Sequence, residues 1–269
     1  MADIKRTKRY EELSLFDDFL FRKIMENNTD LCKELTEVII GRKIGKIISM
    51  NEQNPVEITA DGRGVRFDAY MEDDESTVYD IEMQTYEGKE LLKHTRNYQG
   101  MIDLQMIERG AIFSELKQNY IVFICMKNPF KELGLHKYDI RTVCQQDPTV
   151  PFDDGSHKII LSAEGDKDDV SANLAAFLQY LVTKSAETDL TRRLDEKVRE
   201  SRGHEKWRME YMTLEERDQR MREEGREEGW NSLAKLISFL MEKGLIEEAQ
   251  KAAGDKEYAG KLMEKYSIQ

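Results

Sequence analysis

The sequence predicts a mixed α/β sheet followed by a helical C-terminal extension, and three observations support this. Residues 13–109 contain, in order, helical spacing, three strand-like segments and a second region of helical spacing. NYIVFICM (119–126) is a nearly continuous apolar run of strand length, which is typical of a strand buried inside a sheet. Residues 187–229 are more than half charged, with both signs mixed, as in a long exposed helix.

The elements of the first part follow from hydrophobic spacing and from residues that start or stop helices. Residues 13–41 predict two helices around an NNTD break, with Thr29 as a cap and Gly41 as the end of the second helix. The segments expected to follow are a strand at 44–53, a two-stranded hairpin at 65–84, a helix at 89–109 that stops at Gly110, the buried strand at 119–126, and weaker strands at 136–144 and 157–163.

Beyond residue 168 the sequence predicts helices alone. Residues 170–185 are amphipathic, and 230–266 predict a helical hairpin that turns at Lys243 and Gly244. Within the charged segment, Leu190, Leu194 and Val198 recur every four residues, so one face of that helix can dock on a neighbour. We place the domain boundary near residue 186, which gives a domain of residues 1–186 and a charged helical region of residues 187–269.

Composition excludes several classes of protein. A net charge of −12 argues against coating nucleic acid through bulk electrostatics, although it leaves room for a local basic groove. Cys32, Cys125 and Cys144 stand singly and form neither a disulfide framework nor a CxxC metal pattern. The N-terminal MADIKRTKRY lacks the apolar core of a signal peptide, and no apolar run approaches transmembrane length. We therefore expect a cytoplasmic protein.

The hairpin at 65–84 gathers three carboxylates on one face, because alternate residues of a strand point the same way. A turn centred on Asp74 places Asp68 opposite Asp80 and diagonal to Glu82, whereas a turn centred on Glu75 places Asp68 directly opposite Glu82. At about 4 Å, two like charges repel by roughly 1 kcal/mol in water and about 4 kcal/mol near a protein surface. Something must offset this repulsion.

A divalent cation is one answer, because Mg²⁺ binds hard oxygen ligands and usually takes one or two protein carboxylates. Asp68 and Glu82 are the candidate ligands, and Gln84 can orient an attacking water molecule. The helix that follows presents side chains that can reach a phosphate, namely His94, Arg96, Asn97 and Gln99. The alternative is a polar sheet face exposed to solvent, with Arg66 pairing the acids.

Several ordered segments resemble the PD-(D/E)XK nuclease family transposases, a group that includes the bacterial recombination-promoting nucleases. The segments are FDAYMEDDESTVYDIEMQ, TRNYQGMIDLQMIERG and YIVFICMKNPF, with LFDDFLFRKIM before them and REEGREEGW after them, so that the resemblance covers roughly residues 13–240. Phe67 stands where the motif has proline, and Gln84 replaces the lysine of the wider superfamily, although a Glu-x-Gln form is familiar in this family.

The resemblance implies a restriction-endonuclease-like core of order α-β-β-β-α-β and Mg²⁺-dependent DNA cleavage in a bacterial cytoplasm, with Mn²⁺ or Ca²⁺ as other possible ions. It also implies that Asp68 and Glu82 are the metal ligands, with the backbone carbonyl of Met83 as a third. The first helix matches the family's Asp-Phe-x-Phe-Lys pattern at Asp17, Asp18, Arg22 and Lys23, where we favour surface charges over site residues. We expect Tyr98 and Gln105 to be core or supporting residues.

The expected function is a metal-dependent DNA endonuclease, associated with transposition or recombination, that hydrolyses phosphodiester bonds. In this interpretation Asp68, Glu82 and Gln84 are catalytic, Arg96 binds a substrate phosphate, and the C-terminal helices form a homodimer or higher homo-oligomer. The alternative is a catalytically inactive nuclease fold that acts as a DNA-binding or assembly module, which the acidity of the chain and Gln84 favour slightly.

Overall fold

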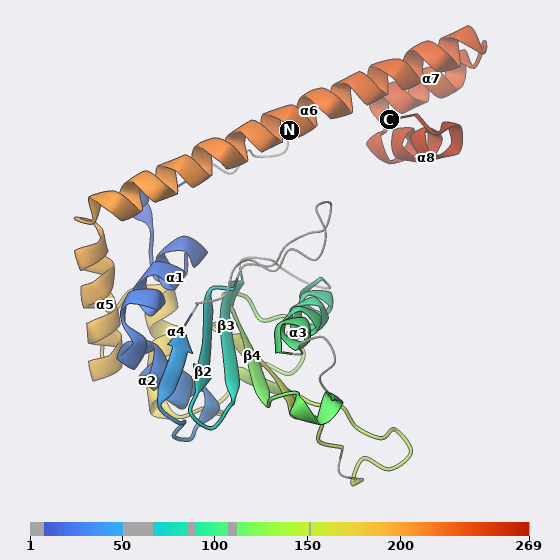
Figure 1. Cartoon of the computed structure of the whole chain (residues 1–269). Helices are drawn as coiled ribbons and strands as arrows, with labels where there is room; N and C mark the ends of the chain where they lie inside the picture. The colour runs from blue at the N-terminus through green and yellow to red at the C-terminus, as the bar shows by residue number, and fades with distance from the viewer. Residues whose placement is uncertain (1–7, 51–66, 85–89, 107–111, 151, 269) are drawn as a thin grey trace. The chain divides into compact units, whose positions relative to one another are not determined.

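The computed structural model of the chain describes residues 8–50, 67–84, 90–106, 112–150 and 152–268 (Figure 1). Residues 8–207 form one compact unit, and a second unit contains residues 208–268. The two units are described separately below. No helix in the described ranges combines the length and the apolar character needed to cross a membrane.

A mixed sheet is the centre of the first unit, and within the described residues it has six strands in the order β1-β2-β3-β4-β6-β5. The strand pairs β3–β4 and β4–β6 are parallel, and the other pairs are antiparallel. The predicted mixed α/β sheet and the interior position of the 119–126 strand are therefore confirmed. The strands are β1 (Ile47–Met50), β2 (Ala69–Asp73), β3 (Val78–Gln84), β4 (Asn119–Cys125), β5 (Lys137–Ile140) and β6 (Ser156–Ser162).

The β2–β3 hairpin turns about Glu75, because Tyr70 pairs with Asp80 and Ala69 pairs with Ile81. Of the two registers that the sequence allows, the structure has the one that places Asp68 opposite Glu82. Asp73 fixes the turn: its carboxylate accepts hydrogen bonds from the backbone N–H groups of Glu75 at 3.0 Å and Thr77 at 2.9 Å. The same carboxylate accepts from the N–H of Gly45 at 3.1 Å, which connects the turn to the segment before β1.

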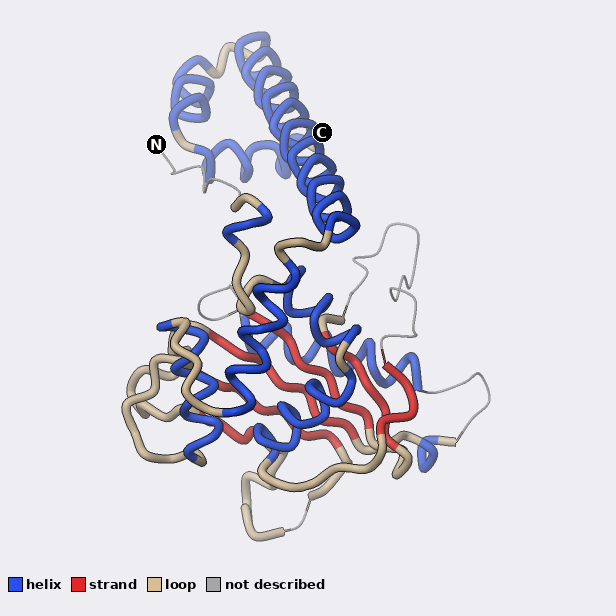
Figure 2. The backbone as a smooth tube through the Cα atoms, turned by 90° about the vertical axis from the view of Figure 1, so that its left-hand side faces the viewer, coloured by secondary structure: helices blue, strands red, loops and turns tan. Residues whose placement is uncertain are grey.

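Helices cover both faces of the sheet (Figures 1 and 2). Helices α1 (Asp18–Asn27) and α2 (Thr29–Ile40) lie on one face, where α1 contacts β2 and β3 and the sulfur of Cys32 lies 3.8 Å from that of Met71. Helix α3 (Leu91–Met106) covers the other face with Leu91, Met101 and Ile102, which pack with Tyr70, Val78 and Phe123 of the sheet. The predicted helix pair at 13–41 is confirmed, except that the residue preceding α2 is Asn28 and Thr29 is already helical.

Helix α5 (Asp189–Ser201) packs in the sheet-containing unit, against α1, α2 and α4 (Ala172–Thr183). The predicted docking face is confirmed, because Leu190, Leu194 and Val198 are all buried. The charged segment is not one helix as predicted, since α5 ends at Ser201 and the next helix begins at Glu205. The domain boundary near residue 186 stays a prediction. The compact unit that contains the sheet extends to residue 207.

The second unit contains most of α6 (Glu205–Glu242) together with α7 (Ile246–Gly254) and α8 (Lys256–Tyr266). Leu236 and Leu240 of α6 pack with small and apolar residues of α7 and α8 in a separate core. The predicted turn is confirmed at Gly244, whose φ is 74°. The helix expected after this turn is divided at Asp255, whose side chain accepts from the backbone N–H groups of Glu257 and Tyr258 and so starts α8.

Replacing Leu194 with Ala tests the docking of α5. Leu194 is 0% exposed, so its truncation leaves a cavity, and we expect the free energy of unfolding to fall by about 2–5 kcal/mol. The measurement is urea denaturation of the full chain followed by far-UV circular dichroism. The matched control is Glu196→Ala on the exposed side of α5, which we expect to change the free energy by less than about 0.5 kcal/mol. Equal effects of the two substitutions would contradict the packing described here.

Candidate functional site

Four polar side chains of the β2–β3 hairpin lie buried on one face of the strand pair. Asp68 directly precedes β2, and Asp80, Glu82 and Gln84 occupy alternate positions of β3 and so share one face. Their exposed fractions are 9%, 0%, 2% and 6%. The alternative of a solvent-exposed polar face is therefore wrong. Arg66, its proposed partner, lies outside the described residues.

Asp68 and Glu82 are held together by a reciprocal pair of hydrogen bonds. The backbone N–H of Asp68 donates to Oε1 of Glu82 at 2.9 Å, and the N–H of Met83 donates to Oδ2 of Asp68 at 3.0 Å. Each carboxylate thus accepts from the backbone of the opposite segment. The structure brings together the two residues that the sequence proposed as a pair.

Burial and mutual repulsion shift the titration of this pair. Burial raises the pKa of Asp68 well above its usual range and the charge of Glu82 raises it further, whereas the Met83 hydrogen bond lowers it. Burial also raises the pKa of Glu82, followed by the repulsion from Asp80. The pair therefore destabilises the fold when both groups are ionised. A bound proton or cation would remove this destabilisation.

Asp80 is a third carboxyl group of the site, which the sequence placed on the correct face but not among the site residues. It is fully buried, and neither of its oxygens has a hydrogen-bond partner with an N–H or O–H group. The Glu82 carboxyl group lies within hydrogen-bonding reach, but two carboxyl groups can form such a bond only when one of them holds a proton. Burial raises the pKa of Asp80 well above its usual range.

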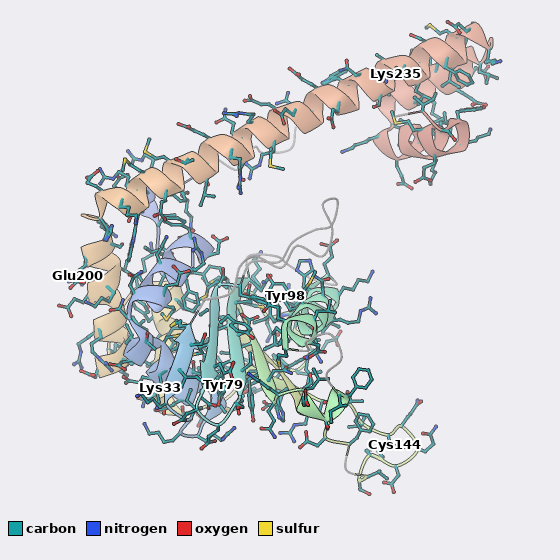
Figure 3. The ribbon with its side chains drawn as sticks, in the orientation of Figure 1. Lys33, Tyr79, Tyr98, Cys144, Glu200 and Lys235 are labelled. Atoms are coloured by element: carbon teal, nitrogen blue, oxygen red, sulfur yellow. The ribbon has the colours of Figure 1, made fainter. Side chains whose placement is uncertain are left out.

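Tyr98 of α3 (Figure 3) lies near Glu82, because its hydroxyl group lowers the pKa of that carboxyl group. Its ring packs edge-on against Phe67 and Phe123, at centroid distances of 5.7 and 5.3 Å. This packing agrees with the expected core or supporting position, but the effect on Glu82 was not anticipated. The available signal was spacing, because Leu91, Thr95, Tyr98 and Ile102 fall on one helical face and the others are buried against the sheet.

Helix α1 contributes a cation that we expected on the surface. Arg22 is 6% exposed, pairs with Glu26 at 3.1 Å and lies close enough to Asp68 to lower its pKa, while Asp18 opposes this effect. The surface interpretation is therefore wrong for Arg22. Asp17 has a structural role, since it accepts from the backbone N–H of Ser14 at 2.7 Å before α1 begins.

The structure gives the surroundings of two of the four polar residues proposed on α3, Gln99 and Arg96. Gln99 donates to Asp103 at 2.8 Å and accepts from the Ser156 hydroxyl group at 2.5 Å, so it joins α3 to β6, and its phosphate contact stays a prediction. Arg96 is exposed. A contact between Arg96 and a substrate stays a prediction.

A mixed sheet whose antiparallel hairpin presents paired carboxylates, with helices on both faces and further helices after it, has the architecture of a PD-(D/E)XK nuclease core with a C-terminal extension. Residues 15–147 match the family model described as PD-(D/E)XK nuclease family transposase. The resemblance inferred from the sequence is thereby confirmed over these residues, and its extension to about residue 240 stays a prediction. No match is found among curated proteins or among solved structures.

PD-(D/E)XK nucleases generally use divalent metal ions, and the donor set of this site fits such an ion. Its atoms are carboxylate and amide oxygens, which are hard ligands. Oδ1 and Oδ2 of Asp80 and Oε1 of Gln84 are buried without a hydrogen-bond partner, as expected of groups that bind something other than protein. Within the described residues, no group of three or more Asp, Glu, His or Cys side chains could hold a metal ion, so an ion at this site would need backbone, water or substrate oxygens as further ligands.

Replacing Glu82 with Gln tests the strain between the acids. The folded-state pKa values of Asp68, Asp80 and Glu82 are raised above their unfolded values of about 4, so the folded chain binds more protons than the unfolded chain at higher pH. The stability carried by these groups is therefore lost as pH rises from about 4 through the folded pKa values. In EDTA, we expect the variant to gain stability relative to the native chain between about pH 5 and pH 8, as measured by chemical denaturation.

The control for this measurement is Asp73→Asn, because Asp73 is equally buried on β2 but fully hydrogen-bonded. Its replacement weakens four accepted hydrogen bonds, so we expect a loss of about 1–3 kcal/mol. A destabilising Glu82→Gln variant at about pH 8 would contradict the strain assigned to the carboxylates.

Proposed function

We propose that this chain is a Mg²⁺-dependent DNA endonuclease that hydrolyses phosphodiester bonds. The observation that carries this proposal is the buried pair of Asp68 and Glu82, each fixed by a hydrogen bond from the backbone beside the other. Evolution of a stable sheet alone would not favour such a pair, because like charges opposite each other destabilise strand pairing. A bound cation would offset that repulsion, and the two carboxylates would serve as its ligands.

In this mechanism Asp68, Glu82 and the backbone carbonyl of Met83 would hold the ion. When bound, the ion would polarise a phosphate oxygen and lower the pKa of water at the site. Gln84 hydrogen-bonds the attacking water molecule and aims it at phosphorus. The Tyr98 hydroxyl group favours the ionised form of Glu82, since it lowers the pKa of that carboxyl group. In-line attack breaks the bond from phosphorus to the leaving oxygen, with no covalent enzyme intermediate.

Gln84 limits what the site can do without the ion, because an amide offers hydrogen bonds and no positive charge. Arg22 of α1 lowers the pKa of Asp68, but Asp18 of the same helix raises it by more, and Arg22 is paired with Glu26. The bound ion would therefore be the main source of positive charge at this site.

The remaining roles are further parts of the proposal. Arg96, exposed on α3, would bind a phosphate of the DNA backbone, as arginine forks commonly do. The C-terminal helices would mediate homo-oligomer formation, which suits cleavage of both strands. The cellular setting would be a bacterial cytoplasm, in recombination or element mobility.

Replacing Asp68 or Glu82 with Ala tests the nuclease proposal. We expect metal-dependent nicking of supercoiled plasmid to fall by about 10²-fold or more, because the ion supplies several kcal/mol of transition-state stabilisation. Thermal stability without metal should be equal or higher, since a buried charge is removed. The assay is gel-based nicking in Mg²⁺, Mn²⁺ and Ca²⁺ series.

The matched control is Glu72→Gln, which removes a β2 carboxylate that is paired with Lys117 near the turn. This variant should cleave as the native chain does. Undiminished cleavage by both alanine variants would refute the site. A native chain that binds DNA but cleaves nothing in any of the ions would instead support the catalytically inactive binding or assembly module.

Replacing Arg96 with Ala tests the substrate contact. The loss of one phosphate contact should weaken DNA binding about uniformly across sequences and reduce the salt slope of the logarithm of affinity by about 1. Binding is measured by fluorescence anisotropy at several salt concentrations in Ca²⁺. Lys131→Ala, at an exposed lysine in the loop after β4, is the control for removing one charge. If Arg96→Ala and Lys131→Ala have the same salt slope, Arg96 has no specific role in DNA binding.

A further inference from the structure

A row of three stacked rings crosses the sheet on the face opposite to the acids. Tyr79 of β3 pairs in register with Tyr120 of β4, which pairs with His157 of β6. The ring centroids of the two tyrosines are 5.6 Å apart, and those of Tyr120 and His157 are 4.4 Å apart, with interplanar angles of 16° and 14°. Because Tyr79 precedes Asp80 on β3, this row and the carboxylates lie on different faces.

The buried end of the row holds the other two rings in place. Tyr79 (Figure 3) is 1% exposed and donates its hydroxyl group to Asp73 at 2.8 Å. Tyr120 and His157 are half-buried, so each of them also reaches the surface. The row therefore presents a hydroxyl group and an imidazole in fixed positions, which the proposed mechanism does not use.

Two arginines lie beside the accessible part of the row. Gly41 ends α2 with a φ of 83°, and Arg42 follows it outside the helix. The guanidinium carbon of Arg42 lies 5.6 Å from the centroid of the Tyr120 ring, and its Nη2 donates to the Tyr120 hydroxyl group at 3.2 Å. Burial lowers the pKa of His157, and Arg141, which directly follows β5, lies close enough to lower it further.

Neither arginine is neutralised by a close acid. Both are exposed, and within the described residues neither Arg42 nor Arg141 forms an ion pair. The acids near His157 are used in their own loop, where Asp153 and Asp154 accept from backbone N–H groups at 3.1 and 3.0 Å. The two guanidinium groups are therefore available to an anion, in a chain whose net charge is −12.

The donors of this cluster match a single phosphate group. Arginine forks bind phosphate oxygens through two parallel hydrogen bonds. The Tyr120 hydroxyl group accepts from Arg42 and can donate its own proton, and a neutral imidazole has one N–H group to donate. Asp153 and Asp154 would repel the neighbouring phosphates of a continuous DNA backbone, so a terminal phosphate with two negative charges fits better.

We propose that four side chains bind a phosphate monoester of a nucleotide or of a 5′-phosphorylated DNA end, namely those of Arg42, Tyr120, His157 and Arg141. A phosphate monoester carries about −1.5 to −2 charges near pH 7, which two arginines balance. The inference goes beyond the proposed nuclease function and does not depend on it, because the cluster lies on the other face of the sheet and needs no metal ion.

The test is binding of a 5′-phosphorylated oligonucleotide to the full chain in EDTA, measured by fluorescence anisotropy at about pH 7.5. The matched probe has the same sequence and a 5′-hydroxyl group. We expect the phosphorylated probe to bind about tenfold or more tightly. Arg42→Gln and Arg141→Gln should each abolish most of this preference. Lys43→Gln, which removes an exposed charge that pairs with Glu37 at 2.6 Å, should keep it.

Competition by deoxyadenosine monophosphate separates the two sources of the phosphate. An affinity equal to that of the phosphorylated oligonucleotide identifies a free nucleotide as a sufficient ligand, and a weaker affinity identifies the DNA end. Both outcomes support the phosphate monoester. Equal binding of the two oligonucleotides by the native chain, or a full preference in both arginine variants, would overturn the site.

A measurement on the native chain keeps the inference testable if an arginine variant does not fold. Burial lowers the pKa of His157, Arg141 and Arg42 lower it further, and Asp153 and Asp154 raise it. A phosphate beside the imidazole should raise this pKa, because a negative charge favours the protonated ring. The shift is followed by NMR of the ring Cε1–H signal, in inorganic phosphate against sodium chloride of equal ionic strength. A pKa of His157 that phosphate leaves unchanged would overturn the site.

Discussion

The crowding of carboxylates at the open end of the β2–β3 hairpin is the constraint on which the rest of the site depends. Asp68 and Glu82 are close because each accepts a hydrogen bond from the backbone of the opposite segment, so the register of the hairpin determines their distance. A slip of one residue would move every side chain of a strand to the other face and separate them. The turn that sets this register is in turn held by Asp73. One buried aspartate near the turn thus positions the acids at the far end.

Asp73 and Asp80 show how a single residue type can stabilise or strain the same sheet. Both are fully buried. Asp73 receives hydrogen bonds from three backbone N–H groups and from the Tyr79 hydroxyl group, so its charge is compensated by protein. Asp80 receives none, and its neighbours include another acid. Burial alone therefore says nothing about role; the number of donors around a buried carboxylate separates a structural acid from one that requires a ligand or a proton.

Much of the fold could be predicted from the sequence, because hydrophobic periodicity and helix stops are local signals. The structure has two helices around the NNTD break and a strand at the apolar run 119–126, as predicted. The regularly spaced apolar residues of α5 are buried, as also predicted, namely Leu190, Leu194 and Val198. The hairpin face was predictable for the same reason, although two registers remained, because the choice depends on the hydrogen bonds of Asp73 with the turn and with Gly45. The roles of Arg22 and Tyr98 could not be assigned, since their effects on the pKa values of the acids depend on elements far apart in the chain. The lack of hydrogen-bond donors around Asp80 likewise could not be predicted, because it depends on the packing of α3 over this face of the sheet.

Helix α6 carries both tryptophans of the chain, Trp207 and Trp230, whereas the sheet contains tyrosine and phenylalanine. Trp207 stacks on His204 at a centroid distance of 4.3 Å, and Trp230 is 69% exposed. Indole emission therefore reports on α6, where Trp207 ends the sheet-containing unit and Trp230 lies in the second unit, and no strand that holds the acids carries an indole. A change of tryptophan fluorescence on adding ions or DNA would indicate a change in the surroundings of that helix. Following the sheet by fluorescence requires a tryptophan introduced into it.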